Sequence, residues 1–148
     1  MKNQFYRQVL GLLDLNFKNK KVLVTGGAGY IGSVVGEHLH TLGYHLVVID
    51  DLRDGKKEAV PASATFYEAN FFDETILDTI FTTHNIGCII HLAASANVPD
   101  SVINPLPYYE NNVTATVTLL NKMKQYGVMS ILFSSTIGSA SISARKAI

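Results

Sequence analysis

Short apolar runs alternate with amphipathic stretches along most of the chain. Five runs, rich in β-branched or aromatic residues, predict strands at residues 22–25, 46–49, 65–67, 88–92 and 130–134. Three longer stretches carry apolar residues at helical spacing and predict helices at residues 30–42, 73–83 and 108–126. Apolar strands that alternate with helices predict a parallel sheet covered on both faces, so the expected fold class is α/β.

Individual residues mark where these elements begin and end. Gly43 and Gly127 directly follow two of the predicted helices, as expected for helix C-termini. Asp73 is a suitable N-cap for the helix at residues 73–83. The polar stretch 51–61 and the stretch 93–107, which contains three prolines, predict loops.

The turn between the first strand and the first helix reads Thr-Gly-Gly-Ala-Gly-Tyr-Ile-Gly, residues 25–32. Gly27, Gly29 and Gly32 match G-x-G-x-x-G, in which glycine permits a tight turn, the approach of a pyrophosphate and close helix–strand packing. The helix that follows offers free N–H groups to an anion. Asp50 ends the next strand eighteen residues after Gly32, where a carboxylate can accept hydrogen bonds from ribose hydroxyls. Together these features predict a Rossmann-like, doubly wound domain that binds a dinucleotide.

Charged residues after the second strand bear on which dinucleotide is bound. Asp50 and Asp51 disfavour a 2′-phosphate on the adenosine ribose, so NAD is the expected cofactor rather than NADP. Arg53 is the opposing observation, because an arginine here can accept that phosphate. Asp51 also fits a simpler interpretation as a solvated turn residue.

Composition narrows the functional class. The 148 residues are 47% hydrophobic and carry no net charge, which favours one folded domain and argues against disorder or a nucleic-acid platform. The single cysteine, Cys88, cannot form an intrachain disulfide and points to a reducing compartment. No apolar run is long enough for a membrane span or a signal peptide. We therefore expect a cytoplasmic protein with no membrane, nucleic-acid or metal partner, in which residues 1–20 form an N-terminal extension.

Several longer segments match one known family, in order and with similar spacing. They are residues 21–33, 48–52, 89–98, 100–102, 104–106, 108–114 and 133–136. These segments resemble the UDP-glucose 4-epimerases (UDP-galactose 4-epimerases), a family of extended short-chain dehydrogenase/reductases. The Tyr-Tyr-x-Asn-Asn-Val and Asn-Pro-Leu segments favour the epimerases over related sugar-nucleotide enzymes. The resemblance implies NAD-dependent interconversion of UDP-galactose and UDP-glucose in galactose metabolism, by an isomerase that takes a UDP-sugar and forms a homodimer when complete.

The resemblance also assigns roles to individual positions. One set of residues would bind the pyrophosphate, adenosine or nicotinamide part of NAD: Gly26, Gly29, Tyr30, Ile31, Gly32, Asp50, Asp51, Asn70, Phe71, Leu92, Ala93, Ala94, Asn111 and Ser134. Asn70 stands where the family usually has an aspartate that contacts the adenine amino group. Thr136 stands at the position of the catalytic Ser or Thr, whose hydroxyl binds the 4-oxygen of the sugar. The residues alone also fit Asn111 and Asn112 as residues that cap or solvate a helix start, and His91 as a buried core imidazole.

The sequence departs from the family in its catalytic base. The family uses a Tyr-x-x-x-Lys pair on one helical face, and no tyrosine of this chain is followed by lysine at that spacing. We therefore expect no turnover from the 148 residues alone. After Thr136, residues 137–148 are small and aperiodic and form a tail unlike the family. This predicts a partial NAD-binding domain at residues 21–136 that stops before the catalytic helix and the substrate domain. The expected cause is a truncated or frame-shifted gene product, or a partial chain.

Two other functions stay open. The chain fits a non-catalytic NAD-binding fragment, and it fits the N-terminal half of another sugar-nucleotide dehydratase or decarboxylase. A chain without the catalytic helix should also expose the apolar face of its fourth and fifth strands, which favours association.

Overall fold

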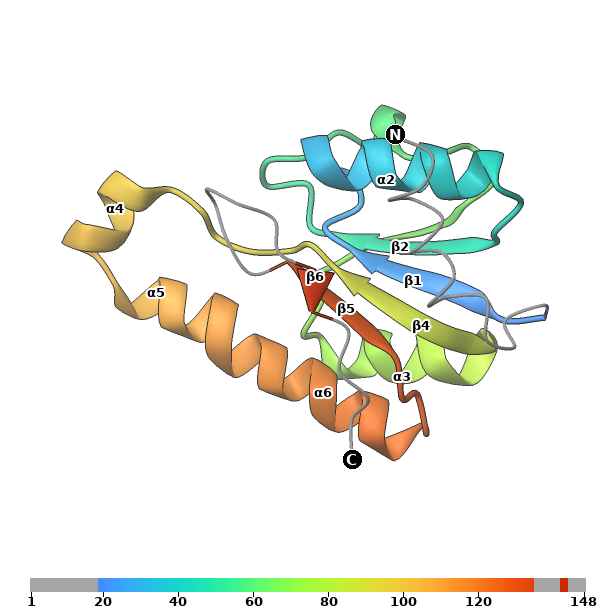
Figure 1. Cartoon of the computed structure of the whole chain (residues 1–148). Coiled ribbons are helices and arrows are strands. Elements are labelled where there is room, and N and C mark those ends of the chain that lie inside the picture. Colours follow the sequence, from blue (N-terminus) through green and yellow to red (C-terminus); the bar gives the residue numbers. More distant parts are fainter. Residues whose placement is uncertain (1–18, 135–141, 144–148) are drawn as a thin grey trace.

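One sheet organises the part of the chain that the structure describes. The computed structural model describes residues 19–134 and the backbone of residues 142–143 (Figure 1). Within these ranges the strand order is β3-β2-β1-β4-β5-β6. The strands are β1 (Lys21–Thr25), β2 (Leu46–Asp50), β3 (Thr65–Glu68), β4 (Ile86–His91), β5 (Ile131–Ser134) and β6 (Ile142–Ser143). The first five strands pair parallel with one another, so the predicted parallel α/β sheet is confirmed.

Helices cover both faces of this sheet (Figure 1). They include α2 (Tyr30–Thr41) on one face, and α3 (Glu74–Thr83) and α6 (Ala115–Gln125) on the other. Side chains alternate along a strand, so Val22 of β1 packs in the cluster with Leu39 of α2, whereas Leu23 packs in the cluster with Leu77 of α3. Each central strand therefore serves two cores, which explains its apolar sequence. No helix in the described ranges is long and apolar enough to cross a bilayer.

The predicted loops need correction, because both contain short helices. Residues 93–107 include α4 (Val98–Ile103) and lead into α5 (Leu106–Tyr109). Prolines occupy the first turns of both helices, where the missing proline N–H would have no intrahelical partner in any case. A 3₁₀ turn, η1 (Lys57–Ala59), interrupts the predicted loop at residues 51–61.

The predicted helix at residues 108–126 is helical but not uniform. Between α5 and α6 lies a π-helical turn, η2 (Glu110–Thr114). Wide turns of this kind are rare and frequently lie at functional sites. The turn contains two consecutive asparagines, Asn111 and Asn112.

The sheet edge beyond β4 also differs from the prediction. β6 pairs antiparallel with β5, so a sixth strand of two residues lies in a stretch expected to be irregular. Every residue of β4 is buried, so the expected exposure of its apolar face is wrong. β4 pairs with strands on both sides, and Ile89 and Ile90 pack into the two opposite clusters. Phe133 of β5 is 36% exposed, in line with the expectation for the fifth strand.

Candidate functional site

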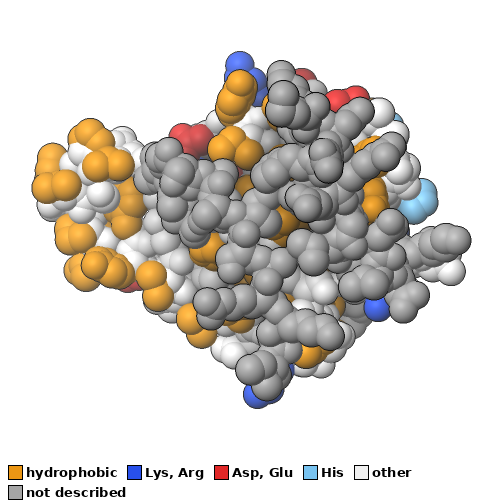
Figure 2. Space-filling view, viewed as in Figure 1, with side chains coloured by type: hydrophobic (Ala, Val, Ile, Leu, Met, Phe, Trp, Pro, Cys, Tyr) orange, Lys and Arg blue, Asp and Glu red, His pale blue; other side chains and the backbone are white. Residues whose placement is uncertain are grey.

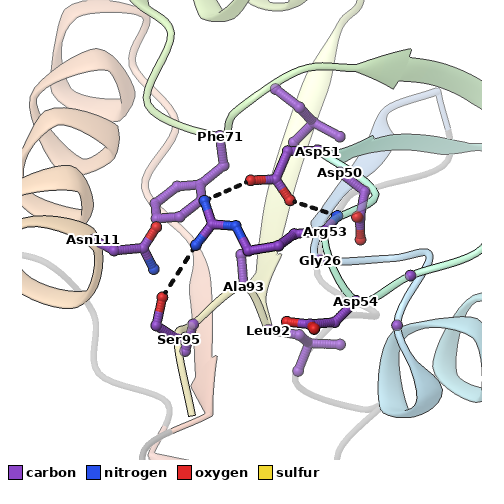
Figure 3. A pocket seen from close by; sticks show the side chains of 14 residues that line it. Gly26, Asp50, Asp51, Arg53, Asp54, Phe71, Leu92, Ala93, Ser95 and Asn111 are labelled. Carbon is purple, nitrogen blue, oxygen red and sulfur yellow. Dashed lines mark hydrogen bonds and ion pairs between the residues drawn. The ribbon is translucent and has the colours of Figure 1, made fainter. Parts of the chain in front are cut away.

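A pocket opens at the carboxyl ends of β1, β2 and β4 (Figure 3). This edge of a parallel sheet gathers the loops that follow the strands. The pocket is lined by Gly26, Gly29, Ile49, Asp50, Asp51, Arg53, Asp54, Gly55, Phe71, Leu92, Ala93, Ala94, Ser95 and Asn111. Nine of these fourteen residues are among those assigned to a dinucleotide site from the sequence. The fold therefore brings most of the predicted positions together.

The glycines of the first turn differ in what would prevent a side chain at each position. Gly26 has a φ of +71°, and a side chain there would meet the backbone nitrogen of Ala93 at 2.7 Å. Gly32 packs against the backbone of Gly26 too closely for any Cβ. Gly29 lines the pocket, and a Cβ there would meet only the carbonyl oxygen of Gly26, at 3.5 Å. Packing within the protein does not require glycine at position 29, whereas a ligand lying against this turn would.

Asp50 holds two loops of the pocket together. Its Oδ2 accepts a hydrogen bond from the Ala28 N–H at 2.9 Å, and its Oδ1 accepts one from the Leu52 N–H at 2.8 Å. Leu52 turns the chain with a φ of +58°, in the left-handed region. The aspartate is 9% exposed, and each carboxylate oxygen can accept a second hydrogen bond. The residue predicted to bind ribose therefore also fixes the glycine turn.

The loop after β2 is tied to the glycine turn, and its Arg53 side chain crosses the pocket. The Lys56 N–H donates to the Ala28 carbonyl oxygen at 3.0 Å. The Arg53 side chain extends across the pocket (Figure 3). Its Nη2 donates to Asp51 Oδ2 at 2.9 Å, and its Nη1 donates to Ser95 Oγ at 3.4 Å. Arg53 thus joins the rim after β2 to the rim after β4.

The two asparagines of η2 form a hydrogen-bond network with the loop that follows β4. Asn112 Oδ1 accepts from the Ser95 N–H at 2.8 Å, and Asn112 Nδ2 donates to the Ser95 carbonyl oxygen at 2.9 Å. Asn111 lines the pocket and donates through Nδ2 to Asn112 Oδ1 at 3.0 Å. Neither side chain caps a helix, so the capping interpretation of Asn111 is wrong.

Behind the pocket wall, His91 is the centre of a buried hydrogen-bond chain. The Thr116 hydroxyl donates to the Asn112 carbonyl oxygen at 2.9 Å, so it accepts from His91 Nε2–H at 3.2 Å. His91 Nδ1 is then unprotonated and accepts from the Thr25 hydroxyl at 2.7 Å. Burial lowers the pKa of His91 to about 4, so the ring is neutral at pH 7. This arrangement agrees with a core imidazole.

Some predicted residues do not line this pocket. They are Tyr30, Ile31, Gly32, Asn70 and Ser134. Tyr30 and Ile31 begin α2 and are 88% and 60% exposed, and their backbone N–H groups, which have no acceptor within the helix, are candidate donors to a ligand. Asn70 Oδ1 is buried and has no hydrogen-bond partner in the described part of the chain. Thr136 lies outside the described residues.

Some lining residues had no role assigned to them as site residues. They are Ile49, Arg53, Asp54, Gly55 and Ser95. Gly55 carried a usable signal, because a Cβ there would meet the backbone of Ala28 at 2.8 Å. A single glycine in a polar loop is too common to be selected without that contact.

Comparison with known proteins places this geometry in a family. The model of the NAD dependent epimerase/dehydratase family matches residues 22–145. The chain belongs to that family. Two curated relatives illustrate the match. The UDP-glucose 4-epimerase of Halalkalibacterium halodurans is 50% identical over 115 residues, which cover 78% of this chain and 34% of the relative. That of Bacillus subtilis is 43% identical over 122 residues, covering 78% and 36%.

Solved structures of UDP-glucose 4-epimerases share the fold of this epimerase/dehydratase chain. The Thermotoga maritima enzyme, determined with UDP-glucose, is 42% identical with a TM-score of 0.75, covering 78% of this chain and 38% of that one. The Thermus thermophilus enzyme, in complex with NAD, is 38% identical with a TM-score of 0.75, covering 78% and 37%. The predicted Rossmann-like fold and the resemblance to epimerases are confirmed. The chain spans about a third of the length of the curated relatives it matches.

Proposed function

We propose that this chain binds NAD in the pocket at the carboxyl ends of β1, β2 and β4. The observation that carries the proposal is the Asp50 carboxylate, which is hydrogen-bonded to the glycine turn in a pocket that also includes the end of β4. The residues present fit a dinucleotide. Gly29 leaves a cradle that a Cβ would fill, and Asn70 Oδ1 is a buried acceptor without a partner in the described residues.

The proposed contacts follow the pocket from one end to the other. Asp50 accepts hydrogen bonds from the adenosine ribose. Asn70 does not itself line the pocket but precedes the lining residue Phe71, and its Oδ1, without a partner among the described residues, is the proposed acceptor for the adenine amino group. The backbone around Gly29 and the start of α2 receive the pyrophosphate. Residues 92–94 and Asn111 flank the nicotinamide. When bound, NAD supplies a hydride acceptor for the oxidation of an alcohol.

We further propose that these residues form the cofactor-binding half of a UDP-glucose 4-epimerase that interconverts UDP-galactose and UDP-glucose. The identity of the relatives supports this proposal. In the longer enzyme, Thr136 would bind the 4-oxygen of the UDP-sugar, and a second subunit would complete a homodimer. The 148 residues contain no Tyr-x-x-x-Lys pair to take the proton from the 4-hydroxyl. Loss of a general base alone costs about 10²–10⁴-fold in rate, so this chain should bind NAD without measurable turnover.

The decisive experiment uses Gly29, because this glycine is not required by packing. Gly29→Ala adds a methyl group that faces the ligand but meets only the Gly26 carbonyl oxygen within the protein. Gly29 is the N-cap of α2. We expect NAD affinity, measured by isothermal titration calorimetry, to fall at least about tenfold, while replacing this N-cap glycine costs about 1 kcal/mol of stability. Gly36→Ala is the matched control, since Gly36 lies in α2 outside the pocket and a Cβ there makes an ordinary 3.5 Å contact with Pro61.

Two results would contradict the proposal. If the wild-type chain shows no affinity for NAD, the pocket is not a dinucleotide site. If Gly29→Ala and Gly36→Ala bind NAD equally well, the ligand does not lie against the glycine turn. An assay of UDP-galactose conversion by the same protein separates an active enzyme from a binding module, and turnover there would refute the assignment of a missing base.

A further inference from the structure

The charges around the pocket do not suit an anionic ligand at first sight. Three carboxylates line it, from Asp50, Asp51 and Asp54. The diphosphate of a dinucleotide carries two negative charges, which these carboxylates repel. Among the lining residues that the structure describes, Arg53 is the only cation. Any electrostatic compensation from a lining side chain therefore has to come from this arginine.

The Arg53 guanidinium lies near the middle of the pocket rather than at one end. Its two hydrogen-bond partners are Asp51, which follows Asp50, and Ser95, which follows residues 92–94. Under the proposed function, Asp50 marks the ribose end and residues 92–94 mark the nicotinamide end. The guanidinium lies between Asp51 and Ser95, across the open pocket (Figure 3). In a dinucleotide, the diphosphate is the part between the two ends.

Two hydrogen bonds position the Arg53 side chain, and they do not use all of its N–H donors. A guanidinium has five N–H donors in a fixed plane. The contacts to Asp51 and Ser95 use two of them, which leaves three for a ligand as far as the described residues are concerned. Paired N–H groups of arginine match the spacing of phosphate oxygens. Holding the side chain at both rims reduces the rotamer entropy that ligand binding would otherwise cost.

We propose that Arg53 binds the diphosphate of NAD, opposite the glycine turn, and supplies the positive charge that the three aspartates make necessary. This inference rests on the proposed NAD binding. It differs from the role that the sequence suggested for Arg53, which was to accept a 2′-phosphate on the ribose. The contact with Ser95 directs the guanidinium across the pocket, and Asp51 beside it repels a 2′-phosphate.

The test compares two charge-neutralising substitutions in the full 148-residue chain. Arg53→Gln removes the pocket cation, whereas Lys56→Gln removes a cation from the same loop that does not line the pocket. NAD, NADP and ADP-ribose are titrated by calorimetry, and adenosine by ligand-observed NMR. We expect Arg53→Gln to weaken NAD and ADP-ribose about tenfold, as for loss of a charged hydrogen bond, with less than about a twofold effect on adenosine. Lys56→Gln should leave all four ligands nearly unchanged, and Arg53→Lys, which keeps charge without the fork, should lie between.

Each other outcome overturns the inference in a recognisable way. Unchanged NAD affinity in Arg53→Gln means that the arginine does not touch the diphosphate. Tighter NAD binding means that it obstructs the pocket, and an equal loss for adenosine means that it only shapes the pocket. A loss confined to NADP assigns Arg53 to the 2′-phosphate. If wild-type protein binds none of the four ligands, the proposed function itself fails together with this inference.

Discussion

At the scale of single residues, the pocket is held together by hydrogen bonds between polar groups. Asp50 could be identified from the sequence because an acid at the end of the second strand is a known feature of dinucleotide sites. Its hydrogen bonds to the Ala28 and Leu52 N–H groups could not, because they depend on the backbone geometry of the glycine turn and of the left-handed turn at Leu52. His91 shows the same limit: the apolar strand indicated burial, but only the hydroxyl of Thr116 determines which ring nitrogen carries the proton.

The buried His91 predicts a pH-dependent stability. Its pKa is about 4 in the folded protein, against an ordinary value of 6.5, because burial disfavours the imidazolium. The unfolded chain therefore binds more protons in this range, and stability is lost as the pH falls from 6.5 towards 4. Between pH 7 and pH 5 we expect the free energy of unfolding to fall by about 2 kcal/mol from this group alone. Urea unfolding at pH 7, 6 and 5 measures the change.

A variant isolates the contribution of this one histidine. His91→Gln removes the titratable group, so its unfolding free energy should change much less across the same pH range. His84 has a pKa lowered by burial and by Lys21, so it acts in the same direction, and His84→Gln should retain most of the pH dependence. A wild-type protein equally stable at pH 7 and pH 5 would show that His91 does not need to be neutral in the fold.

At the scale of elements, helix ends were easier to predict than helix contacts. The N-cap role of Asp73 is confirmed, since its Oδ1 accepts from the Thr75 and Ile76 N–H groups at 3.0 and 3.1 Å. In contrast, nothing in the sequence showed that Lys122 of α6 donates to Asp78 of α3 at 2.7 and 2.9 Å. That contact lowers the pKa of Asp78, chiefly through the hydrogen bond from Lys122. Local patterns define a cap, whereas a pair 44 residues apart depends on how the helices pack.

The cap on α3 gives a prediction at this scale. Asp73→Ala leaves two N–H groups of the first turn without their acceptor, and should cost about 1 kcal/mol of unfolding free energy. Asp73→Asn keeps an acceptor in the same place and should cost only a few tenths, at about the level of error in chemical unfolding. Equal stability of Asp73→Ala and wild type would mean that water replaces the cap at no cost.

At the scale of the whole molecule, the parallel sheet and both covering layers followed from the sequence, whereas the strand order came from the structure. The surface around α4, α5 and α6 did not follow either, because prolines in this region were interpreted as loop signals. Apolar side chains gather over α4 and α5 (Figure 2). Along the continuous helix, the exposed fractions are 70% for Leu106, 65% for Tyr109, 53% for Val113, 51% for Val117 and 43% for Leu120. Val117 and Leu120 are three residues apart on one face of α6, and Leu106, Tyr109 and Val113 continue the exposed apolar surface along α5 and η2.

An exposed apolar stripe of this length predicts association of the isolated chain. Sedimentation velocity over a range of concentrations should show species larger than a monomer. The double substitution Val117→Lys and Leu120→Lys should shift the distribution towards monomer. Val34→Lys is the control, because Val34 is 60% exposed on α2, over the opposite face of the sheet (Figure 1). A wild-type chain that stays monomeric at every concentration would contradict the prediction.

The π turn η2 also sets the directions in which the side chains on this helix point, some towards the pocket and others towards the core. An α-helix turns by about 100° per residue, since it has about 3.6 residues per turn. Within η2, Asn111 lines the pocket and Asn112 is hydrogen-bonded to Ser95. A few residues later, Leu119 packs in the core beneath the sheet. Deleting one residue from η2 would rewind it as α-helix, and Asn111 and Asn112 would no longer reach the pocket and Ser95 together. A one-residue deletion in η2 should therefore disturb the pocket more than most single substitutions in this turn.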